Sequence, residues 1–344
     1  MVSKMIDISQ KEELIKYLSE KNIISNAKGL EIHFFSGGVS GATALIKDGN
    51  VEFLVKQAYE KLKVKESWEC DQKRIKIEYD ALAVYKQIVP EAVPTPLSFD
   101  EENYIMIREA VSEDWKMWKS DLLDGILKIE VAEKAIDALS KIHNSTSSMT
   151  ELRDKFGDGK IFYDLRADAY ILHLTKKYPQ LKQIAEKVVA MLMESGICLI
   201  HGDYSPKNIL VKGSDICILD LEVAYYGNPC FDLAFFANHL LLKAVLNKKI
   251  SSDYLEMMKY MMDRYFSKLS FMEPKLLEKQ TVHTLGLLFL ARVDGKSPVE
   301  YLTSEQDKNL VRNTAMRIIE EEMDTVEQVI ACLKNAIERH GVAE

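Results

Sequence analysis

The spacing of apolar positions divides the chain into two stretches with different periodicities. Up to about residue 110, short apolar runs bounded by turn residues predict β-strands. The predicted strands cover residues 30–35, 42–46, 51–55, 97–99 and 104–107. Asp48-Gly49 separates the second run from the third, and this dipeptide is typical of a hairpin. Helical periodicity is limited here to residues 10–21 and 71–88, so the N-terminal part is expected to be rich in β-structure.

From about residue 131 onward, the apolar positions repeat with helical spacing. The predicted helices cover residues 132–143, 183–194, 229–246, 252–269, 279–291, 304–320 and 325–340. Short apolar runs at residues 197–200, 209–211 and 216–219 interrupt them and predict strands. The pattern therefore predicts an α+β fold, with a small β-rich lobe over residues 1–110 and a larger, mainly helical lobe over residues 111–344.

The composition is that of an ordinary globular protein, with 344 residues, 47% hydrophobic and 28% charged. The net charge of −8 and the lack of a Lys/Arg cluster interleaved with aromatic residues argue against nucleic acid as a partner. No apolar run is long enough to span a bilayer, and the first 17 residues lack the apolar core of a signal peptide. Five cysteines without Cys-x-x-Cys or metal-site spacing are typical of a reducing compartment, so we expect a cytoplasmic protein without membrane contact.

The most informative polar segment is His-Gly-Asp-Tyr-Ser-Pro-Lys-Asn at residues 201–208, which lies between two predicted strands. A second acid, Asp220, follows twelve residues after Asn208, at the end of the next apolar run. Phosphoryl transfer from ATP needs a carboxylate that accepts the proton of the attacking hydroxyl, together with oxygen ligands for magnesium. The spacing His-x-Asp-x₄-Asn matches the protein-kinase catalytic loop, with Gly202 in place of its arginine. It therefore predicts Asp203 as the base and Asn208 and Asp220 as Mg²⁺ ligands.

The N-terminal part supplies candidates for an ATP clamp. The turn after the first predicted strand contains Gly37, Gly38, Val39, Ser40 and Gly41, whose backbone amides could approach phosphates. Lys56 ends the third strand, where a kinase places the lysine that binds the α- and β-phosphates, and Glu78 on the following helix could pair with it. Each feature alone is also compatible with an ordinary turn, an edge-strand lysine or a solvated helix face. Their order and spacing together favour nucleotide binding.

With these motifs the chain resembles the aminoglycoside phosphotransferase and choline kinase superfamily of small-molecule kinases, from about residue 30 to residue 302. Within that group, residues 55–58, 64–78 and 220–232 resemble 5-methylthioribose kinases. Leu221 stands where those enzymes usually have proline, and Arg292 stands alone where they usually have two arginines. The resemblance implies a bilobal protein-kinase-like fold, with ATP and Mg²⁺ as cofactors.

The resemblance also implies roles for further residues. Backbone groups of Arg108, Glu109 and Ala110, where the lobes join, would bind the adenine edge. The candidates for acceptor contacts are Tyr204, Ser205, Arg292 and Asp294. Glu222 could be a metal ligand beside Asp220 or an exposed acid at a strand end, with the resemblance favouring the metal. Asp232 is expected to support the catalytic loop and His143 to be a structural hydrogen-bonding residue, while Trp68 could line the active-site mouth or pack on the first lobe.

The sequence thus predicts an ATP- and Mg²⁺-dependent kinase of a small-molecule hydroxyl, with a methylthioribose-like sugar as one candidate acceptor. One alternative is a kinase of an aminoglycoside or a choline-like amino alcohol, which would need an acidic acceptor pocket. An alternative of another class is a catalytically silent nucleotide-binding module. The sequence argues against it, because it contains the complete set Lys56, Glu78, Asp203, Asn208 and Asp220. The acceptor and the oligomeric state stay open, with a homodimer as one option.

Overall fold

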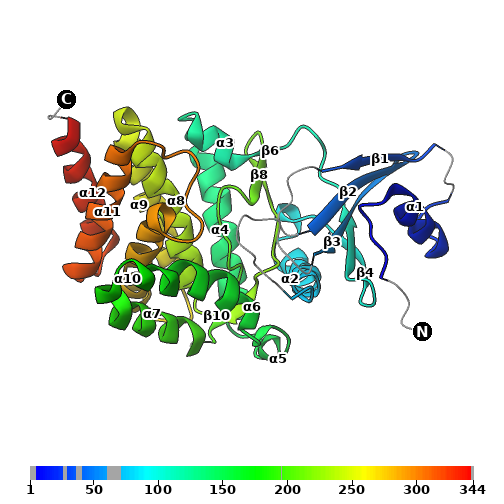
Figure 1. Ribbon diagram of the computed structural model, residues 1–344, viewed down its shortest axis with the longest axis horizontal. Coiled ribbons are helices and arrows are strands. Elements are labelled where there is room, and N and C mark those ends of the chain that lie inside the picture. Colours follow the sequence, from blue (N-terminus) through cyan, green and yellow to red (C-terminus); the bar gives the residue numbers. More distant parts are fainter. Residues whose placement is uncertain (1–4, 26–28, 36–40, 60–70, 195, 342–344) are drawn as a thin grey trace. The chain divides into compact units, whose positions relative to one another are not determined.

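A computed structural model describes residues 5–25, 29–35, 41–59, 71–194 and 196–341 (Figure 1). The chain divides into two compact units. Unit 1 consists of Met1–Asp114 together with Asp220–Glu222, and unit 2 consists of Trp115–Leu219 and Val223–Glu344. The sequence predicted a single boundary after residue 110. It did not predict that Asp220–Glu222 would belong to unit 1.

Unit 1 is built on a five-stranded sheet in the order β1-β2-β3-β5-β4, in which all neighbouring strands are antiparallel. Its strands are β1 (Glu31–Phe34), β2 (Gly41–Asp48), β3 (Val51–Ala58), β4 (Pro96–Asp100) and β5 (Ile105–Glu109). The hairpin predicted at Asp48-Gly49 joins β2 to β3, and Gly49 adopts a φ of 62° that favours glycine. The sheet confirms the β-rich N-terminal part.

Two helices cover opposite faces of this sheet. Helix α1 (Lys11–Glu20) packs Leu14 and Leu18 against a core that includes Val55 and Ile107. Helix α2 (Arg74–Ile88), which is followed by the short 3₁₀-helix η1 (Pro90–Ala92), packs against β3, β4 and β5. Because side chains alternate along a strand, Lys56 on β3 points away from Val55 and toward α2. This alternation directs the Lys56 side chain toward the helix that carries Glu78.

Unit 2 is mainly helical, and it confirms the helix-rich C-terminal part of the predicted α+β fold. Its α-helices are α3 (Trp118–Leu123), α4 (Ile129–Thr146), α5 (Leu152–Phe156), α6 (Lys160–Phe162), α7 (Lys182–Glu194), α8 (Cys230–Leu246), α9 (Ser251–Ser267), α10 (Pro274–Asp294), α11 (Glu305–Glu320) and α12 (Val326–Gly341). A π-helix, η2 (Tyr163–Ile171), and the 3₁₀-helices η3 (Leu172–Lys176), η4 (Pro179–Leu181) and η5 (Lys248–Ile250) complete the set.

Helix α8 forms the centre of unit 2. Nearly all of its side chains are buried, as expected of a helix that is apolar all round, and it packs against α9, α10 and α11. Two small sheets hold the polar loop at residues 201–208. One pairs β7 (Cys198–Ile200) with β10 (Tyr225–Gly227), and the other has the order β6 (Lys116–Met117), β8 (Ile209–Lys212), β9 (Asp215–Ile218). The loop therefore begins and ends on fixed strands.

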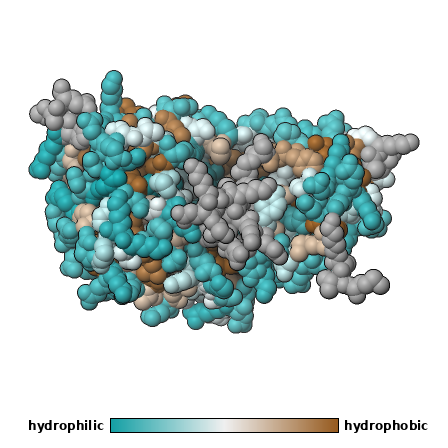
Figure 2. All heavy atoms as spheres, viewed as in Figure 1, coloured by the Kyte–Doolittle hydropathy of each residue, from teal (hydrophilic) through white to brown (hydrophobic). Residues whose placement is uncertain are grey.

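Hydrophilic residues predominate on the molecular face shown in Figure 2, and hydrophobic residues form only small patches between them. Among the described residues, no single helix is both long and apolar enough to cross a membrane. The bent pair Cys230–Leu246 and Lys248–Ser267, whose halves meet at 115°, satisfies the length and composition criteria when both halves are counted together.

Candidate active site

In unit 1, one lysine joins two acidic side chains. The Lys56 Nζ atom lies 2.6 Å from Glu78 Oε2 and 2.8 Å from Asp220 Oδ1. Lys56 comes from β3, Glu78 from α2 and Asp220 from the segment that follows β9 in sequence and belongs to this unit. The Lys56 side chain is 12% exposed and that of Glu78 is 5% exposed, so water screens this ion pair weakly.

These buried charges shift each other's protonation. Burial opposes the charge of Lys56, but the carboxylates of Asp220, Glu78 and Glu222 outweigh it and raise the pKa of the ammonium above its ordinary value. Burial raises the pKa of Glu78 to about 7, since Lys56 only partly offsets the burial and the repulsion from Asp220 and Glu222. A single ammonium thus does not fully neutralise the three carboxylates.

The segment Asp220–Glu222 has an unusual backbone. Asp220 adopts a φ of 66°, a left-handed conformation that costs a non-glycine residue roughly 1–3 kcal/mol. The Glu222 Oε2 atom lies 3.3 Å from Nε of Arg74, whose own guanidinium donates to the backbone carbonyls of Asp71 and Tyr59. Buried Arg74 therefore anchors the segment to the start of α2, and the strained conformation at Asp220 is held in place.

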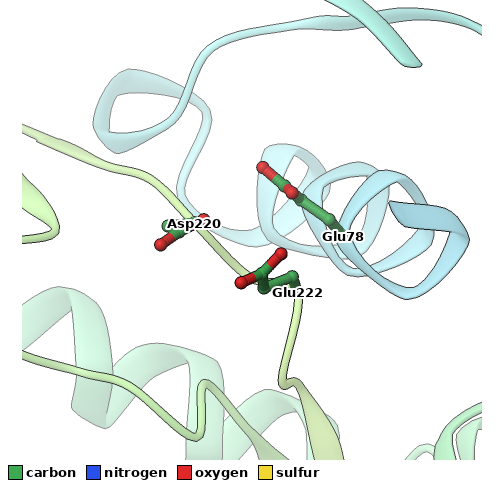
Figure 3. A group of neighbouring side chains, drawn as sticks. All are labelled: Glu78, Asp220 and Glu222. Carbon is green, nitrogen blue, oxygen red and sulfur yellow. The ribbon is translucent and has the colours of Figure 1, made fainter. Parts of the chain in front are cut away.

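Three carboxylates of unit 1 fit a hard divalent cation. Oxygen atoms of Glu78, Asp220 and Glu222 all lie within 4.8 Å of one another (Figure 3). Mg²⁺ prefers oxygen ligands and is commonly held by one or two carboxylates together with phosphate oxygens and water. The pair Asp220 and Glu222 matches the metal ligands predicted from the sequence, and the structure adds Glu78 to the group. The remaining predicted ligand, Asn208, belongs to unit 2.

In unit 2, one buried carboxylate fixes the start of the catalytic loop. Asp232 Oδ2 accepts the backbone N–H of His201 at 2.7 Å, and Oδ1 accepts that of Gly202 at 2.9 Å. His143 Nε2 lies 3.2 Å from the same carboxylate, and its Nδ1 lies 2.7 Å from the hydroxyl of Tyr265. These contacts match the supporting and structural roles expected of Asp232 and His143.

Gly202 explains why this loop lacks the arginine of protein kinases. Its φ is 74°, and a Cβ atom at this position would lie 2.4 Å from the carbonyl oxygen of Val223. Any side chain would therefore require the backbone to move. The Gly202 carbonyl instead accepts a hydrogen bond of 2.6 Å from Nε of Arg166, which reaches the loop from η2.

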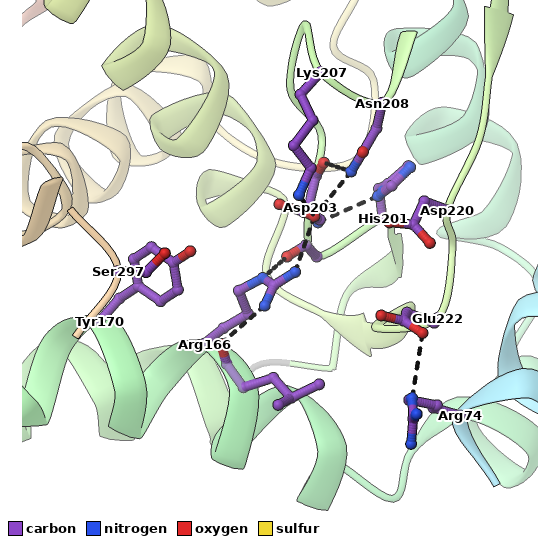
Figure 4. A network of polar contacts seen from close by, with 12 residues as sticks. Arg74, Arg166, Tyr170, His201, Asp203, Lys207, Asn208, Asp220, Glu222 and Ser297 are labelled. Atoms are coloured by element: carbon purple, nitrogen blue, oxygen red, sulfur yellow. Dashed lines mark hydrogen bonds and ion pairs between the residues drawn. The ribbon is translucent and has the colours of Figure 1, made fainter. Parts of the chain in front are cut away.

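Three donors converge on one oxygen of Asp203, as Figure 4 shows. Asn208 Nδ2 lies 2.8 Å from Asp203 Oδ2, and Arg166 Nη2 and Lys207 Nζ each lie 3.1 Å from it. Asn208 also donates to the Asp203 backbone carbonyl at 3.0 Å, so its carboxamide oxygen points away from that carboxylate. The orientation of Asp203, the predicted base, is thus determined by neighbours on both its own loop and η2.

A family model for the phosphotransferase enzyme family matches residues 31–244, which include both groups of residues. The chain belongs to this family. A methylthioribose kinase of Bacillus cereus is 27% identical over 263 residues, which are 67% of this chain and 65% of that protein. The chain thus spans somewhat less than two thirds of the length of that relative.

Solved structures share the phosphotransferase fold at lower identity. An amicoumacin kinase in complex with AMP-PNP, Ca²⁺ and its ligand has a TM-score of 0.59 and 11% identity, covering 91% of this chain and 96% of that one. A choline kinase from Cryptosporidium parvum Iowa II has a TM-score of 0.53 and 16% identity, covering 96% and 100%. These similarities confirm the predicted kinase-like fold.

The nucleotide clamp expected of a phosphotransferase is described only in part. Gly37, Gly38, Val39, Ser40 and Trp68 lie outside the described residues. Gly41 begins β2, where a Cβ atom would lie 2.2 Å from the carbonyl oxygen of Gln57, so this position requires glycine.

The predicted adenine-binding segment at the end of β5 makes internal contacts. The Glu109 N–H donates to the carbonyl of Thr95 at 2.8 Å, and the Glu109 carbonyl accepts from Nη1 of Arg108 at the same distance. Both backbone groups of Glu109 are therefore engaged within unit 1. Ala110, the next predicted residue, follows the end of the strand.

Two of the four predicted acceptor residues are placed for structural roles. The Tyr204 side chain is fully buried, and its hydroxyl donates to the carbonyl of Ala135 at 2.6 Å. Asp294 accepts both Nε and Nη2 of Arg312, at 2.8 and 2.9 Å, and so ties α10 to α11. We therefore do not retain Tyr204 or Asp294 in the acceptor site.

The other two acceptor candidates are placed differently. Ser205 is fully buried within the catalytic loop, and its Oγ has no hydrogen-bond partner among the described residues. Arg292 on α10 donates through Nη1 to the carbonyl of Ser297 and lies 3.3 Å from the hydroxyl of Tyr170. Ser205 and Arg292 remain candidates for acceptor contacts.

Sequence reasoning missed Arg166 and gave Lys207 no role, although both contact Asp203. Lys207 lies inside the motif at residues 201–208, so its position near the base could have been predicted from the sequence. Arg166 lies on a π-helix in which apolar and polar residues alternate, a pattern that does not indicate a helix, and π-helical turns often occur at functional sites.

Proposed function

We propose that this phosphotransferase is an ATP- and Mg²⁺-dependent kinase that transfers a phosphoryl group to a hydroxyl of a small molecule. The observation that carries the proposal is the contact of Lys56 with both Glu78 and Asp220 in unit 1. In a phosphoryl-transfer site, such a lysine binds the nucleotide phosphates, and the glutamate on the helix keeps it in position. Membership of the phosphotransferase family supports the same reaction class.

In this proposal the residues of unit 1 serve the nucleotide. Lys56 binds phosphate oxygens, and Asp220, with Glu222 and Glu78 beside it, holds the cation. Bound Mg²⁺ would neutralise the negative charge that develops on the phosphate groups. Arg74 keeps Glu222 directed toward the same group through its ion pair.

The residues of unit 2 serve the hydroxyl in this proposal. Asp203 accepts the hydroxyl proton, and its orientation is fixed by Arg166, Lys207 and Asn208. Asp232 holds the loop itself by accepting two of its backbone amides. As a Mg²⁺ ligand Asn208 would use its carboxamide oxygen, because its amide group donates to Asp203.

The test is ADP release from Mg-ATP with a panel of hydroxyl compounds: methylthioribose, choline, ethanolamine and an aminoglycoside. Replacing Asp203 by Asn keeps the size of the side chain and removes the proton acceptor. We expect kcat to fall by at least about 10²-fold, the usual share of general-base catalysis, while ATP binding is kept. Near-normal turnover in Asp203→Asn would exclude Asp203 as the base, and ATP binding without ADP release for any acceptor would favour a silent nucleotide-binding module.

A further inference from the structure

Cationic side chains from α3, α8 and α10 gather next to the catalytic loop within unit 2. Lys119 on α3 donates its backbone N–H to the carbonyl of Pro206 in that loop, at 2.9 Å. Two ammonium groups lie near the ring of Tyr301, whose centroid is 5.7 Å from Lys119 Nζ and 5.5 Å from Lys243 Nζ. Arg292 on α10 adds a third cation, which lowers the pKa of Lys243.

Carboxylates compensate these cations only in part. Lys119 pairs with Glu300. Over the described part of the chain, neither Lys243 nor Arg292 has a carboxylate within ion-pair distance. Lys243 is fully buried, and its Nζ donates to the backbone carbonyl of His239 at 3.3 Å. Burial is the main cause that lowers the pKa of Lys243 to about 7; Lys119 and Arg292 lower it further, and Glu300 partly opposes them.

Polar atoms without partners lie in the same region. Arg292 Nε, the Tyr301 hydroxyl and Ser205 Oγ are all buried and have no hydrogen-bond partner among the described residues. Buried polar atoms are nearly always paired, and an unpaired one commonly marks the place of a ligand or an ordered water. All three atoms can donate a hydrogen bond, and they lie beside cationic side chains. A negatively charged oxygen ligand would satisfy both features at once.

An aromatic side chain connects Arg292 to the catalytic base. The guanidinium of Arg292 lies 5.6 Å from the ring centroid of Tyr170, and the guanidinium of Arg166 lies 5.8 Å from the same centroid. Arg166 in turn contacts Asp203 (Figure 4). Although burial raises the pKa of the Tyr170 hydroxyl, Arg292 and Arg166 outweigh it and lower that pKa below its ordinary value. Arg292 is thus linked to Asp203 through the Tyr170 ring and Arg166.

We propose that the acceptor of this kinase carries an anionic oxygen group, a carboxylate or a phosphate, which Arg292 binds directly and Lys243 attracts from within the core. This inference rests on the proposed function and adds the chemical class of the acceptor to it. A guanidinium can bind such a group with two parallel hydrogen bonds, whereas an amino alcohol or an aminoglycoside would meet charges of its own sign. Methylthioribose is uncharged, so the proposed acceptor differs from the one named for the Bacillus relative.

The experiment compares acceptors with and without an anionic group. The probes are glycerate against glyceramide, gluconate against gluconamide, and glycerol 3-phosphate against glycerol, each tested for ADP release with Mg-ATP. The carboxylate and phosphate pairs distinguish the two kinds of anionic group. We expect the anionic member of at least one pair to have a kcat/KM at least about tenfold higher, the value of about 1.4 kcal/mol of added binding.

Substitutions connect that preference to the named residues. Arg292→Gln should lower kcat/KM for the anionic member by about 30-fold or more, through KM, and change that of the neutral member by less than about twofold. Lys243→Met should cause a smaller loss of the same kind. Arg317→Gln and Lys259→Met, which remove exposed cations paired with Glu321 and Asp263, are the matched controls and should change neither value.

The outcomes separate this inference from the proposed function. If ADP is released but neutral or cationic acceptors are preferred, or if Arg292→Gln leaves the anionic preference intact, the inference is wrong and the kinase assignment stands. Isothermal titration of the nucleotide-free protein with the three anionic probes gives a readout besides turnover. Saturable binding that Arg292→Gln abolishes supports the inference, and lack of binding for all three probes overturns it. Absence of ADP release with every acceptor, neutral and cationic ones included, would count against the proposed function.

Discussion

Replacing Asp232 by Asn should destabilise unit 2 at the catalytic loop. The two carboxylate oxygens of Asp232 each accept a different backbone amide, that of His201 at 2.7 Å and that of Gly202 at 2.9 Å. In Asp232→Asn one of these oxygens becomes an NH₂ group, so one buried amide faces another donor. The size and shape of the side chain are kept, while one acceptor for a backbone amide is lost together with the negative charge that also faces Nε2 of His143.

The expected magnitude follows from the loss of that acceptor. A hydrogen bond to a charged group contributes about 1.5–3 kcal/mol, and leaving a buried N–H unpaired costs about 1–3 kcal/mol. These are two descriptions of overlapping effects, so we expect the free energy of unfolding to fall by about 3 kcal/mol rather than by their sum. With a urea m-value of about 3 kcal/mol/M, the unfolding midpoint should fall by about 1 M.

Urea unfolding followed by circular dichroism measures this change. The control is Asp263→Asn, which removes an exposed carboxylate 2.9 Å from Lys259 and should cost less than about 0.5 kcal/mol. A loss below about 1 kcal/mol for Asp232→Asn, or a loss equal to that of the control, would refute the reasoning. It would mean that the loop keeps its backbone conformation without the Asp232 carboxylate.

Three further outcomes concern the nucleotide and metal residues. Lys56→Ala should raise the KM for ATP and lower kcat, because the phosphates lose their cation; unchanged constants in a Michaelis analysis would exclude the nucleotide role. Asp220→Ala should abolish activity at any practical Mg²⁺ concentration, whereas Asn208→Ala should be partly rescued by more metal in a Mg²⁺ titration; wild-type turnover in Asp220→Ala would exclude it as the main ligand. Because the folded-state pKa of Glu78 is raised to about 7, the metal-free folded state binds more protons than the unfolded state above the ordinary carboxyl value. The Glu78 carboxyl thus contributes to the free energy of unfolding at low pH, and this contribution is lost as the pH rises to about 7. In urea unfolding between pH 5 and 8, Glu78→Gln should remove this pH-dependent loss of stability; an unchanged pH profile would contradict the expectation.

Local patterns in the sequence were sufficient for the main features of unit 1. The alternation of β3 places Lys56 on the same side as Ala58, which packs with Ile75 of α2. Glu78 lies almost one helical turn beyond Ile75, so a strand pattern and a helix pattern together predict the contact. The Asp48-Gly49 hairpin is equally local. Features that depend on residues close together in the sequence could thus be predicted.

The environment of Asp203 could be predicted only in part. The spacing of the motif indicated Asp203 and Asn208. It did not indicate the direction of the Tyr204 side chain, which lies in the core and donates a hydrogen bond to the Ala135 carbonyl. Arg166 contacts the base from a separate π-helix, η2. This helix and the loop are distant in sequence and come together only in the folded chain. Contacts between segments distant in sequence leave no local pattern.

The two units carry local charges of opposite sign, which the net charge of −8 does not reveal. In unit 1, three carboxylates lie near Lys56, and burial together with repulsion from Asp220 and Glu222 raises the pKa of Glu78. In unit 2, burial together with Lys119 and Arg292 lowers the pKa of Lys243. In our proposals each group binds a ligand of the opposite charge: a divalent cation with its nucleotide in unit 1, and an anionic acceptor in unit 2. This opposition gives the acceptor proposal its sharpest consequence, since a cationic acceptor would be repelled at the very residues that hold an anionic one.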